Sequence, residues 1–566
     1  MSAAPLQIAD AQALTWDDEA DVVVVGFGGA GVATALQASE CGASVIAVDR
    51  FEGGGATAYS GGVMYAGGTR YQRENGFADT PEQMFNYLEA EGSAVPLDTL
   101  RRFCETSNDD IEWVDGHGVP HGGNAFLEKT AFPPDNHWLY YSGNEKMPAF
   151  AARAVPAPRG HRVAINGFGG HLHFAKLREA ALARGVTLWT HAPVQRLVVD
   201  AAGTVLGVEV NALPEVLHPR HQSLYKTVSP WRPFNNDRAE KAIAAAAAVE
   251  RGVSRPKLIR ARRGVVLSTG GFIYNLEMLA EHRPLLAQNY RELLRLGSMG
   301  DDGSGMMLGQ SVGGVTALMD NVCVARTLVP PNVFAHGIIV NLAGRRFINE
   351  GAYAVVVGGA LLEQPGGGKA WLLLESKDFW KGVWKSFFPG GNFWLWGAPA
   401  LLNIFLGGTR RAGTLAKLAK KIGVDPQGLA ATVAAFNAIA TDGRPDPLGK
   451  AQDLVHPLKA GAFYAVNMSL DNKFAPAQAF TMGGLDIDQT NGAVKRGDGS
   501  TIAGLYAAGR VAVGLCSGGY VSGLSIADTV FGGRRAGRAA SGSNRADLSG
   551  AGSPVPVTDL HGDPIR

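Results

Sequence analysis

Residues 21–31 read DVVVVGFGGAG, in which a short β-branched run leads directly into a G-x-G-x-x-G motif. An amphipathic run, VATALQASECG (32–42), follows the glycines, and a second apolar run, SVIAV (44–48), comes next. These runs predict a strand, a tight turn, a helix and a second strand. That order is typical of a Rossmann-like unit that binds a dinucleotide, so the stretch predicts an α/β fold.

The glycines of this motif have distinct structural roles. Gly26 makes the tight turn, Gly28 lets the backbone approach a pyrophosphate, and Gly31 lets the helix pack closely on the strand. The phosphates would lie at the helix N-terminus, where the helix dipole and free N–H groups favour anions. Asp49 follows the glycines by about 20 residues, and its carboxylate is predicted to accept hydrogen bonds from a ribose.

A second glycine-rich loop, GGGATAYSGG (53–62), decides between cofactors. Its backbone N–H groups, with the hydroxyls of Thr57 and Ser60, are suited to a second phosphate and a ribityl chain. A nicotinamide enzyme has no evident need for such a loop. The sequence therefore favours FAD.

Composition and charge exclude several classes of protein. The 566 residues include 52 basic and 51 acidic side chains, and a net charge of +1 gives no electrostatic basis for a nucleic-acid partner. The four cysteines lie far apart without metal-ligand spacing, so we expect reduced thiols and no metal site. The N-terminal segment is acidic and lacks the features of a secretory signal, which predicts a cytoplasmic protein.

Further motifs recur in order along nearly the whole chain. They are GGATAYSGG (54–62), PVQRLVVD (193–200), GVVLSTGGFIYN (264–275), GDDGSGMMLG (300–309), GIIVNLAGRRFINE (337–350), TMGGLDID (481–488) and GLYAAGR (504–510). With these motifs the chain resembles the flavoproteins of the fumarate reductase and 3-ketosteroid dehydrogenase superfamily. Several ordered matches are far more specific than a single motif.

The resemblance implies a discontinuous Rossmann-like FAD-binding domain with an inserted α+β catalytic cap. Residues 1–300 and 481–545 would form the FAD-binding domain, and residues 301–480 the cap. An aromatic-rich insertion would occupy residues 367–410 of the cap, and residues 546–566 would form a flexible tail. In the succinate dehydrogenase branch a histidine in the loop that matches 54–62 carries the flavin covalently. That loop has no histidine here, so we expect non-covalent FAD.

The last predicted helix begins near Gly523, and its N-terminus would point at the pyrimidine end of the flavin, where it stabilises negative charge. The residues predicted to bind FAD, from the motifs and the resemblance together, are Gly26, Gly28, Gly29, Ala30, Gly31, Asp49, Arg50, Ala56, Thr57, Ser60, Gly61, Gly62, Val194, Gly270, Asp302, Gly509, Gly523, Leu524, Ser525 and Ile526.

Two segments point to the reaction. Fumarate reductases need arginines shortly after RRFINE and in the C-terminal loop, but GAYAVVVGGALL (351–362) and GLCSGGYVSGLSIAD (514–528) contain none. A dicarboxylate there would be an unpaired buried anion. The segments offer Tyr353, Tyr520 and Ser522 instead, a pattern similar to the 3-ketosteroid Δ4-(5α)-dehydrogenases.

Other functions stay open at this stage. The Δ1-dehydrogenases have a Tyr-Pro-Gly-Pro-Gly loop, from which Tyr-Val-Ser-Gly-Leu departs, so Δ4 is favoured over Δ1. A flavin-dependent reductase of fumarate-like enoates and a non-enzymatic flavin-binding module are the remaining alternatives.

Desaturation beside a ketone removes a proton from the α carbon and a hydride from the β carbon to flavin N5. We assign Tyr353 as the base and Tyr520 and Ser522 as groups that polarise the carbonyl or relay the proton, and the two tyrosines could exchange roles. An ordinary tyrosine has a pKa near 10, so a neighbouring hydroxyl or dipole must stabilise the phenolate. Tyr140 is expected to be a core residue that could line the pocket.

Two insertions remain. The basic, alanine-rich segment 211–263 is expected to be a solvated excursion, with an oligomer or electron-acceptor contact as the alternative. The aromatic segment 367–410 has flanking cations, which predicts either a peripheral membrane contact through which a steroid enters or a buried cap or dimer contact. The predicted partners are a small-molecule steroid ketone and an electron acceptor that the sequence does not identify; the oligomeric state is left open.

Overall fold

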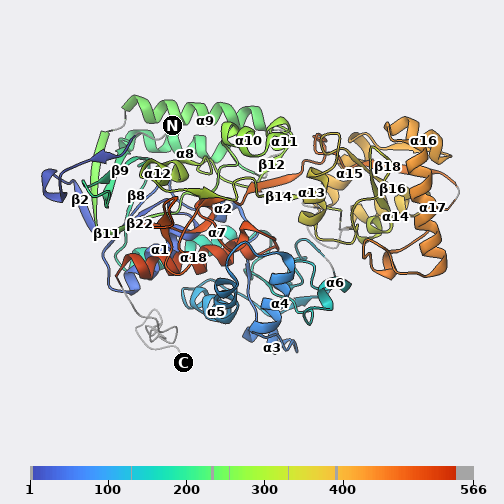
Figure 1. Cartoon of the computed structure of the whole chain (residues 1–566), viewed down its shortest axis with the longest axis horizontal. Helices are drawn as coiled ribbons and strands as arrows, with labels where there is room; N and C mark the ends of the chain where they lie inside the picture. The colour runs from blue at the N-terminus through green and yellow to red at the C-terminus, as the bar shows by residue number, and fades with distance from the viewer. Residues whose placement is uncertain are drawn as a thin grey trace.

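A computed structural model describes residues 4–128, 130–230, 235–253, 255–328, 331–388, 393–394, 396–459 and 461–542. Figure 1 shows a large lobe, which contains the N-terminal and C-terminal parts of the described chain, and a smaller lobe, yellow to orange, beside it. The tail predicted at residues 546–566 lies outside the described residues. None of the helices in the described ranges has the length and apolar character needed to cross a membrane.

A nine-stranded sheet forms the centre of the large lobe. Its main path runs β1-β9-β10-β11-β2-β3-β8, with β22 beside the C-terminal part of β11 and β21 beside β22. The strands are β1 (Leu6–Gln7), β2 (Asp18–Val25), β3 (Val45–Val48), β8 (Thr187–Trp189), β9 (Val194–Val199), β10 (Val205–Ala212), β11 (Arg255–Leu267), β21 (Ala493–Lys495) and β22 (Thr501–Ala507). Strands β8, β3, β2, β11 and β22 run parallel, as the Rossmann-like pattern predicts.

The valines of β2 explain why helices cover both faces of this sheet. Val22 and Val24 pack on one face with α1 (Gly29–Glu40) and α18 (Leu524–Ala540). Val23 and Val25 belong to the core on the other face, together with residues of α8 (His218–Thr227) and α9 (Asn236–Val253). A continuous run of β-branched residues is what a strand buried on both faces requires.

The insertion at residues 211–263 is therefore not a solvated excursion. Tyr225 of α8 and Ala239, Ala242 and Ala246 of α9 are buried in the core on the sheet. The alanines that looked like a generic exposed helix are small because they pack closely there. The expectation was wrong because it rested on basic charge and alanine content, neither of which shows which face a helix buries.

Residues near the two ends of the chain fold together, as the resemblance implies. Val265 of β11 pairs with Val23 on one side and Leu505 on the other. Helix α18 lies alongside α1, and glycines allow the close approach: a Cβ at Gly537 would lie 2.6 Å from the Thr34 carbonyl oxygen. Figure 1 shows these red and blue helices side by side.

A small sheet in the large lobe, ordered β4-β7-β6-β5, carries residues toward the other lobe. Its strands are β4 (Val63–Tyr65), β5 (Ala125–Phe126), β6 (Leu139–Tyr140) and β7 (Gly160–Arg162). The helices of this lobe not yet given are α2 (Gly55–Tyr59), α3 (Arg70–Glu74), α4 (Pro81–Glu91), α5 (Leu97–Gly116), α6 (Pro148–Ala151), α7 (Gly170–Ala183), α10 (Leu276–His282), α11 (Pro284–Gln288) and α12 (Ser304–Ser311).

The smaller lobe has the α+β composition predicted for the cap. It does not begin at residue 301, because α12 packs in the large lobe, where Ser304 and Leu308 lie beside the ends of the large sheet's strands. Its sheet has the order β15-β16-β18-β17, with strands β15 (Ile338–Asn341), β16 (Ala370–Glu375), β17 (Arg410–Ala412) and β18 (Phe463–Asn467). Its helices are α13 (Ala354–Leu362), α14 (Ser376–Phe387), α15 (Gly397–Leu406), α16 (Leu415–Ile422) and α17 (Pro426–Asp442). The lobes are joined where β12 (Leu294–Arg295), β19 (Gln478–Thr481) and β14 (Val322–Ala325) form a three-stranded sheet. Strand β13 (Thr316–Ala317), which precedes β14, pairs with β20 (Gly484–Leu485), which follows β19.

Candidate active site

A cleft of about 660 Å³ lies where β2, β3, β11 and β22 end. In open α/β sheets, ligands bind at the carboxyl ends of the strands. Many of the residues predicted to bind FAD line this cleft, namely Gly26, Gly28, Gly29, Ala30, Asp49, Arg50, Ala56, Thr57, Val194, Gly270, Asp302 and Gly509. The structure thus gathers into one cleft residues from both terminal parts of the chain.

The other predicted cofactor residues lie elsewhere. Gly31 is beneath the turn, where an added Cβ would lie 1.9 Å from the carbonyl oxygen of Gly26. The remaining ones, Ser60, Gly61, Gly62, Gly523, Leu524, Ser525 and Ile526, flank β4 and the start of α18. Strand β4, which follows Ser60–Gly62, contacts the start of α18: the backbone N–H of Tyr65 donates a hydrogen bond to the Gly523 carbonyl at 3.1 Å. Their contact with the cofactor stays a prediction.

The turn at the start of α1 is shaped to receive an anion. Gly26 has a φ of +89°, which favours glycine, and Gly28 caps α1 without any side-chain hydrogen bond. The first N–H groups of the helix are therefore available to a ligand. These features fit the pyrophosphate of FAD.

Asp49 has a role that the fingerprint alone does not reveal. Its carboxylate accepts hydrogen bonds from the backbone N–H groups of Phe27 and Phe51, each at 2.7 Å. Burial raises the pKa of Asp49, although these backbone donors act in the opposite direction. The side chain thus holds the glycine-rich turn in place, and its predicted bond to a ribose remains a prediction.

A second group of residues lies beside the start of α13, where Tyr353 is the N-cap residue and is 9 % exposed. The backbone N–H of Tyr353 donates to Asn144 Oδ1 at 2.8 Å. The Tyr140 hydroxyl lies 3.0 Å from Ser522 Oγ, and Ser522 also interacts with the Tyr353 hydroxyl. Tyr520 is close enough to act electrostatically on Tyr353. The predicted catalytic residues therefore come together, with Tyr140 added.

The surroundings of this phenol cluster (Tyr140, Tyr353, Tyr520 and Ser522) are largely apolar. Phe480 meets the Tyr520 ring edge-on, with 5.1 Å between ring centroids. Cys323, Phe480 and Met482 form a buried cluster against which Tyr520 packs. Such a site suits an uncharged, apolar ligand with a single polar group.

Burial controls the acidity of the phenols. It raises the pKa of Tyr353 well above the usual value, and Ser522 opposes that change only partly. Burial likewise raises the pKa of Tyr140 and of Tyr520. Desolvation therefore opposes ionisation of Tyr353, whereas the Ser522 hydroxyl favours it, as expected of a neighbouring hydroxyl. Which group stabilises a phenolate at this position stays a prediction.

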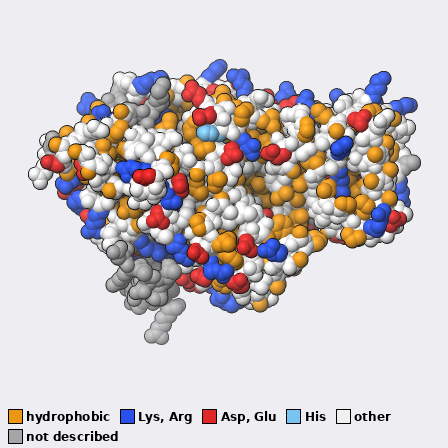
Figure 2. Space-filling model, viewed as in Figure 1, with side chains coloured by type: hydrophobic (Ala, Val, Ile, Leu, Met, Phe, Trp, Pro, Cys, Tyr) orange, Lys and Arg blue, Asp and Glu red, His pale blue; other side chains and the backbone are white. Residues whose placement is uncertain are grey.

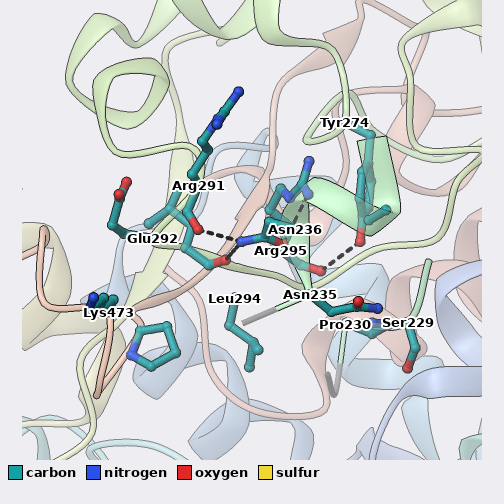
Figure 3. A pocket seen from close by; sticks show the side chains of 13 residues that line it. Ser229, Pro230, Asn235, Asn236, Tyr274, Arg291, Glu292, Leu294, Arg295 and Lys473 are labelled. Atoms are coloured by element: carbon teal, nitrogen blue, oxygen red, sulfur yellow. Dashed lines mark hydrogen bonds between the residues drawn. The ribbon is translucent and has the colours of Figure 1, made fainter. Parts of the chain in front are cut away.

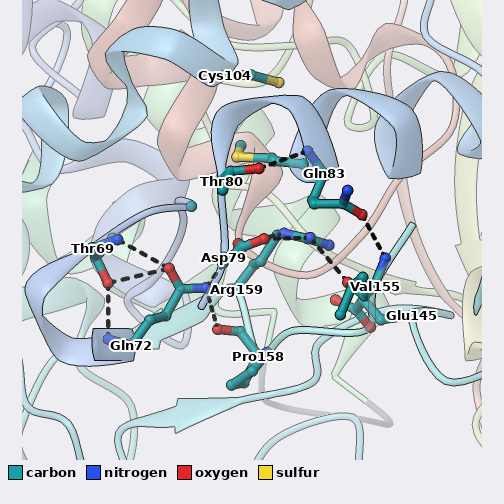
Figure 4. A network of polar contacts seen from close by, with 12 residues as sticks. Thr69, Gln72, Asp79, Thr80, Gln83, Cys104, Glu145, Val155, Pro158 and Arg159 are labelled. Atoms are coloured by element: carbon teal, nitrogen blue, oxygen red, sulfur yellow. Dashed lines mark hydrogen bonds and ion pairs between the residues drawn. The ribbon is translucent and has the colours of Figure 1, made fainter. Parts of the chain in front are cut away.

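A buried polar network holds the segment that carries Tyr140 and Asn144. Arg159 binds Asp79 through two hydrogen bonds of 2.8 and 2.7 Å, and both side chains are completely buried (Figure 4). Asn144 donates to Glu91 at 3.0 Å while its backbone N–H donates to the Tyr87 hydroxyl at 2.8 Å. Glu91 therefore orients the amide that fixes Tyr353.

This network predicts a pH dependence of stability. Burial raises the pKa of Glu91 to about 7, above its value in an unfolded chain. The folded protein then binds the proton more tightly, so the free energy of unfolding should fall as pH rises from about 4.5 to 7, by at most about 1.4 kcal/mol per pH unit. Glu91→Gln should remove this part of the slope, measured by denaturant titration at pH 5, 6, 7 and 8. Identical slopes in both proteins would contradict the assignment.

The comparisons with known proteins agree with this geometry. A family model described as the FAD binding domain matches residues 21–523. The chain belongs to the FAD binding domain family. That membership accounts for the cleft at the strand ends, and FAD is the cofactor that the family binds.

Proteins similar to this chain include steroid dehydrogenases. A 3-oxo-5-alpha-steroid 4-dehydrogenase of Comamonas testosteroni is 36 % identical over 518 residues, which cover 89 % of this chain and 95 % of that protein. A 3-oxosteroid 1-dehydrogenase of Mycobacterium tuberculosis is 27 % identical over 549 residues, which cover 87 % and 93 %. A solved structure, the 3-ketosteroid-delta4-(5alpha)-dehydrogenase of Rhodococcus jostii RHA1 in complex with 4-androstene-3,17-dione, has a TM-score of 0.76 at 30 % identity and covers 95 % of this chain and all of that one.

Sequence reasoning missed several residues that hold the cleft and the phenol cluster in place. Asn144, Glu91 and Glu250 carry no motif, and their roles follow only from contacts between distant segments. Asp301 was also missed, although it adjoins Asp302: it accepts from the Gly271 N–H at 2.9 Å and pairs with Arg510 at 2.8 Å. The matching motif GDDGSGMMLG contains both acids, so that signal was present in the sequence.

Proposed function

We propose that this chain is an FAD-dependent 3-ketosteroid dehydrogenase that introduces a double bond between C4 and C5 of a saturated 5α-3-ketosteroid. The observation that carries the proposal is the phenol cluster, which offers hydroxyls in an apolar site and suits an uncharged ketone. The 36 % identical relative from Comamonas bears the name of this activity.

Each residue of the phenol cluster has a separate role in the proposed reaction. Tyr520 donates a hydrogen bond to the C3 carbonyl, which makes the C4 hydrogen more acidic. Tyr353 accepts that C4 proton while its own hydroxyl proton passes to Ser522, the Ser522 proton passes to Tyr140, and Tyr140 releases its proton to solvent. One proton thus enters the relay from C4 and one leaves it to solvent, so all three hydroxyls end neutral. Bound FAD supplies the two-electron oxidant that accepts the hydride from C5.

Anaerobic titration with a small steroid panel tests the proposal. A saturated 5α-3-ketosteroid should bleach the flavin absorbance and give the 4-en-3-one, because both hydrogens come from the C4–C5 bond. Bleaching only by a 4-en-3-one would instead assign Δ1 desaturation. Reoxidation of the reduced enzyme by fumarate alone, without bleaching by any steroid, would remove the steroid proposal.

We also propose that the cap contacts a membrane at its periphery through α14. Trp380, Trp384 and Phe388 recur at every fourth position of this segment and are 53 %, 67 % and 68 % exposed. Lys377, Lys381 and Lys385 recur with the same spacing beside them and are all exposed. Residues four apart share one face of a helix, so an aromatic stripe lies next to a cationic one.

This pairing favours an anionic lipid surface over a second copy of the chain. Tryptophan rings favour the membrane interface, and lysines attract acidic headgroups. Two copies meeting face to face would bring like charges together. Figure 2 shows hydrophobic side chains gathered around the hollow between the lobes, on a face that a lipophilic steroid could approach.

Vesicle sedimentation checks the membrane contact. The protein should pellet with vesicles that contain phosphatidylserine and stay in the supernatant with phosphatidylcholine alone. Combined Trp380→Ser and Trp384→Ser substitutions should reduce the pelleted fraction severalfold without lowering turnover of dissolved steroid. Lys420→Ser and Lys421→Ser on α16 serve as a matched control. Equal pelleting of all three proteins would contradict the assignment of α14.

A further inference from the structure

Helix α9, which no cofactor motif includes, forms one wall of the FAD cleft. Ala247, Glu250 and Arg251 line the cleft, and their spacing of three and four residues places them on one face of the helix. Ala239, Ala242 and Ala246 anchor α9 on the sheet. The insertion therefore connects the core of the large lobe to the place where the cofactor binds.

Glu250 is the most strongly connected residue of this wall. Its carboxylate accepts from Arg50 Nε at 2.7 Å and from Arg50 Nη2 at 3.1 Å, a two-point contact between planar groups. It also lies 2.9 Å from His221 Nε2, and the His221 ring stacks on Phe51 with 4.5 Å between centroids. Arg50 in turn binds Asp302 at 2.8 Å. Glu250 thus holds the Arg50 guanidinium against the cleft.

The opposite end of α9 is anchored as firmly. Arg295 binds Glu240 at 2.6 Å. Arg295 also binds Asn236 at 3.1 Å, and Asn236 donates to the backbone oxygen of Arg291 at 2.5 Å (Figure 3). The Arg295 guanidinium also lies over the Tyr290 ring at 4.1 Å. With both ends held, the Glu250 carboxylate is kept in place rather than carried on a mobile segment.

The position of Glu250 identifies which end of FAD it would affect. Arg50 follows Asp49 directly, at the end of β3, and in Rossmann-like folds the adenosine ribose binds beside the acid at this strand end. The two Asp49 oxygens already accept backbone N–H groups. A second carboxylate and a guanidinium therefore stand where the adenosine half would lie.

We propose that α9 is an FAD-binding element and that Glu250, by positioning Arg50, fixes the adenosine end of the cofactor. The inference depends on FAD as cofactor and is independent of which steroid bond is oxidised. It assigns a function to an insertion that the sequence presents as an ordinary alanine-rich helix.

FAD release from the holoenzyme tests this proposal. Glu250→Ala should raise the dissociation constant for FAD about tenfold to a hundredfold, measured as free flavin fluorescence after serial dilution, because it leaves Arg50 without its strongest partner. Glu250→Gln keeps the shape but loses the charge, and should give a smaller rise in the same direction. Lys241→Ala, at an exposed position on α9, is the matched control and should leave the constant within twofold of the wild type.

Competition by ADP distinguishes the adenosine end from a general loss of structure. ADP contains only the adenosine half, so its inhibition constant for FAD binding should rise by the same factor as the FAD constant in both Glu250 variants. An FAD constant that rises while the ADP constant stays unchanged would overturn the assignment to the adenosine end. Unchanged constants in both variants would overturn the proposal entirely. Should Glu250→Ala fail to fold, Glu250→Gln alone gives the same comparison.

Discussion

Tyr353→Phe is expected to lower kcat by about 10²–10⁴-fold while the protein stays yellow. The factor is the usual contribution of a positioned general base. Phenylalanine fills the same buried volume, and Tyr353 does not line the FAD cleft, so cofactor content should not change. The rate of flavin bleaching after anaerobic mixing with a 5α-3-ketosteroid measures the effect directly, without a contribution from the electron acceptor.

Tyr464→Phe provides the matched control. Tyr464 is a buried cap tyrosine whose ring stacks on Phe379 with 3.8 Å between centroids, so it shares the residue type and the lobe but not the cluster. Its turnover should stay within threefold of the wild type. A Tyr353→Phe enzyme that bleaches within tenfold of the wild-type rate would show that another group accepts the proton.

The fold was predictable where the local sequence preference and the tertiary packing favour the same structure. Residues 21–49 encode their strand, turn and helix through valines that are buried on both faces and through Gly26 and Gly31, where an added Cβ would clash with backbone atoms. The return of residues 501–540 to the same sheet was predictable only by resemblance, because nothing local shows which strand β22 will pair with. The tyrosines that we propose as catalytic were likewise recognisable through the motifs that contain them.

The remainder of the site depends on contacts between segments that carry no signal of their own. Asn144 binds the backbone of Tyr353 across 209 residues of sequence, and Glu250 binds Arg50 across 200. Each residue is ordinary in type, so composition and spacing cannot distinguish it from a surface residue. Tyr140 was expected in the core, which is correct, yet its hydroxyl meets Ser522, and that contact gives it a place in the relay.

Tyr520→Phe is expected to lower kcat by about 10²–10³-fold, the usual cost of removing one hydrogen-bond donor from a developing oxyanion. Its role is separable from that of Tyr353 by spectroscopy. A hydrogen bond to the carbonyl of a bound 4-en-3-one shifts its ultraviolet absorbance to longer wavelength, because it stabilises the more polar excited state. We expect this shift in the wild type and in Tyr353→Phe, and its loss in Tyr520→Phe.

The two phenols make this comparison decisive because they lie in one cluster but differ in their hydrogen-bond partners. Tyr353 interacts with Ser522, which leads to Tyr140, whereas Tyr520 interacts with Ser525 at the start of α18. The Tyr353 hydroxyl can therefore lose its proton along the relay. Tyr520 has no comparable relay among its described contacts, so it is suited to donate a hydrogen bond while it keeps its proton. Loss of the absorbance shift in Tyr353→Phe and its persistence in Tyr520→Phe would exchange the two roles.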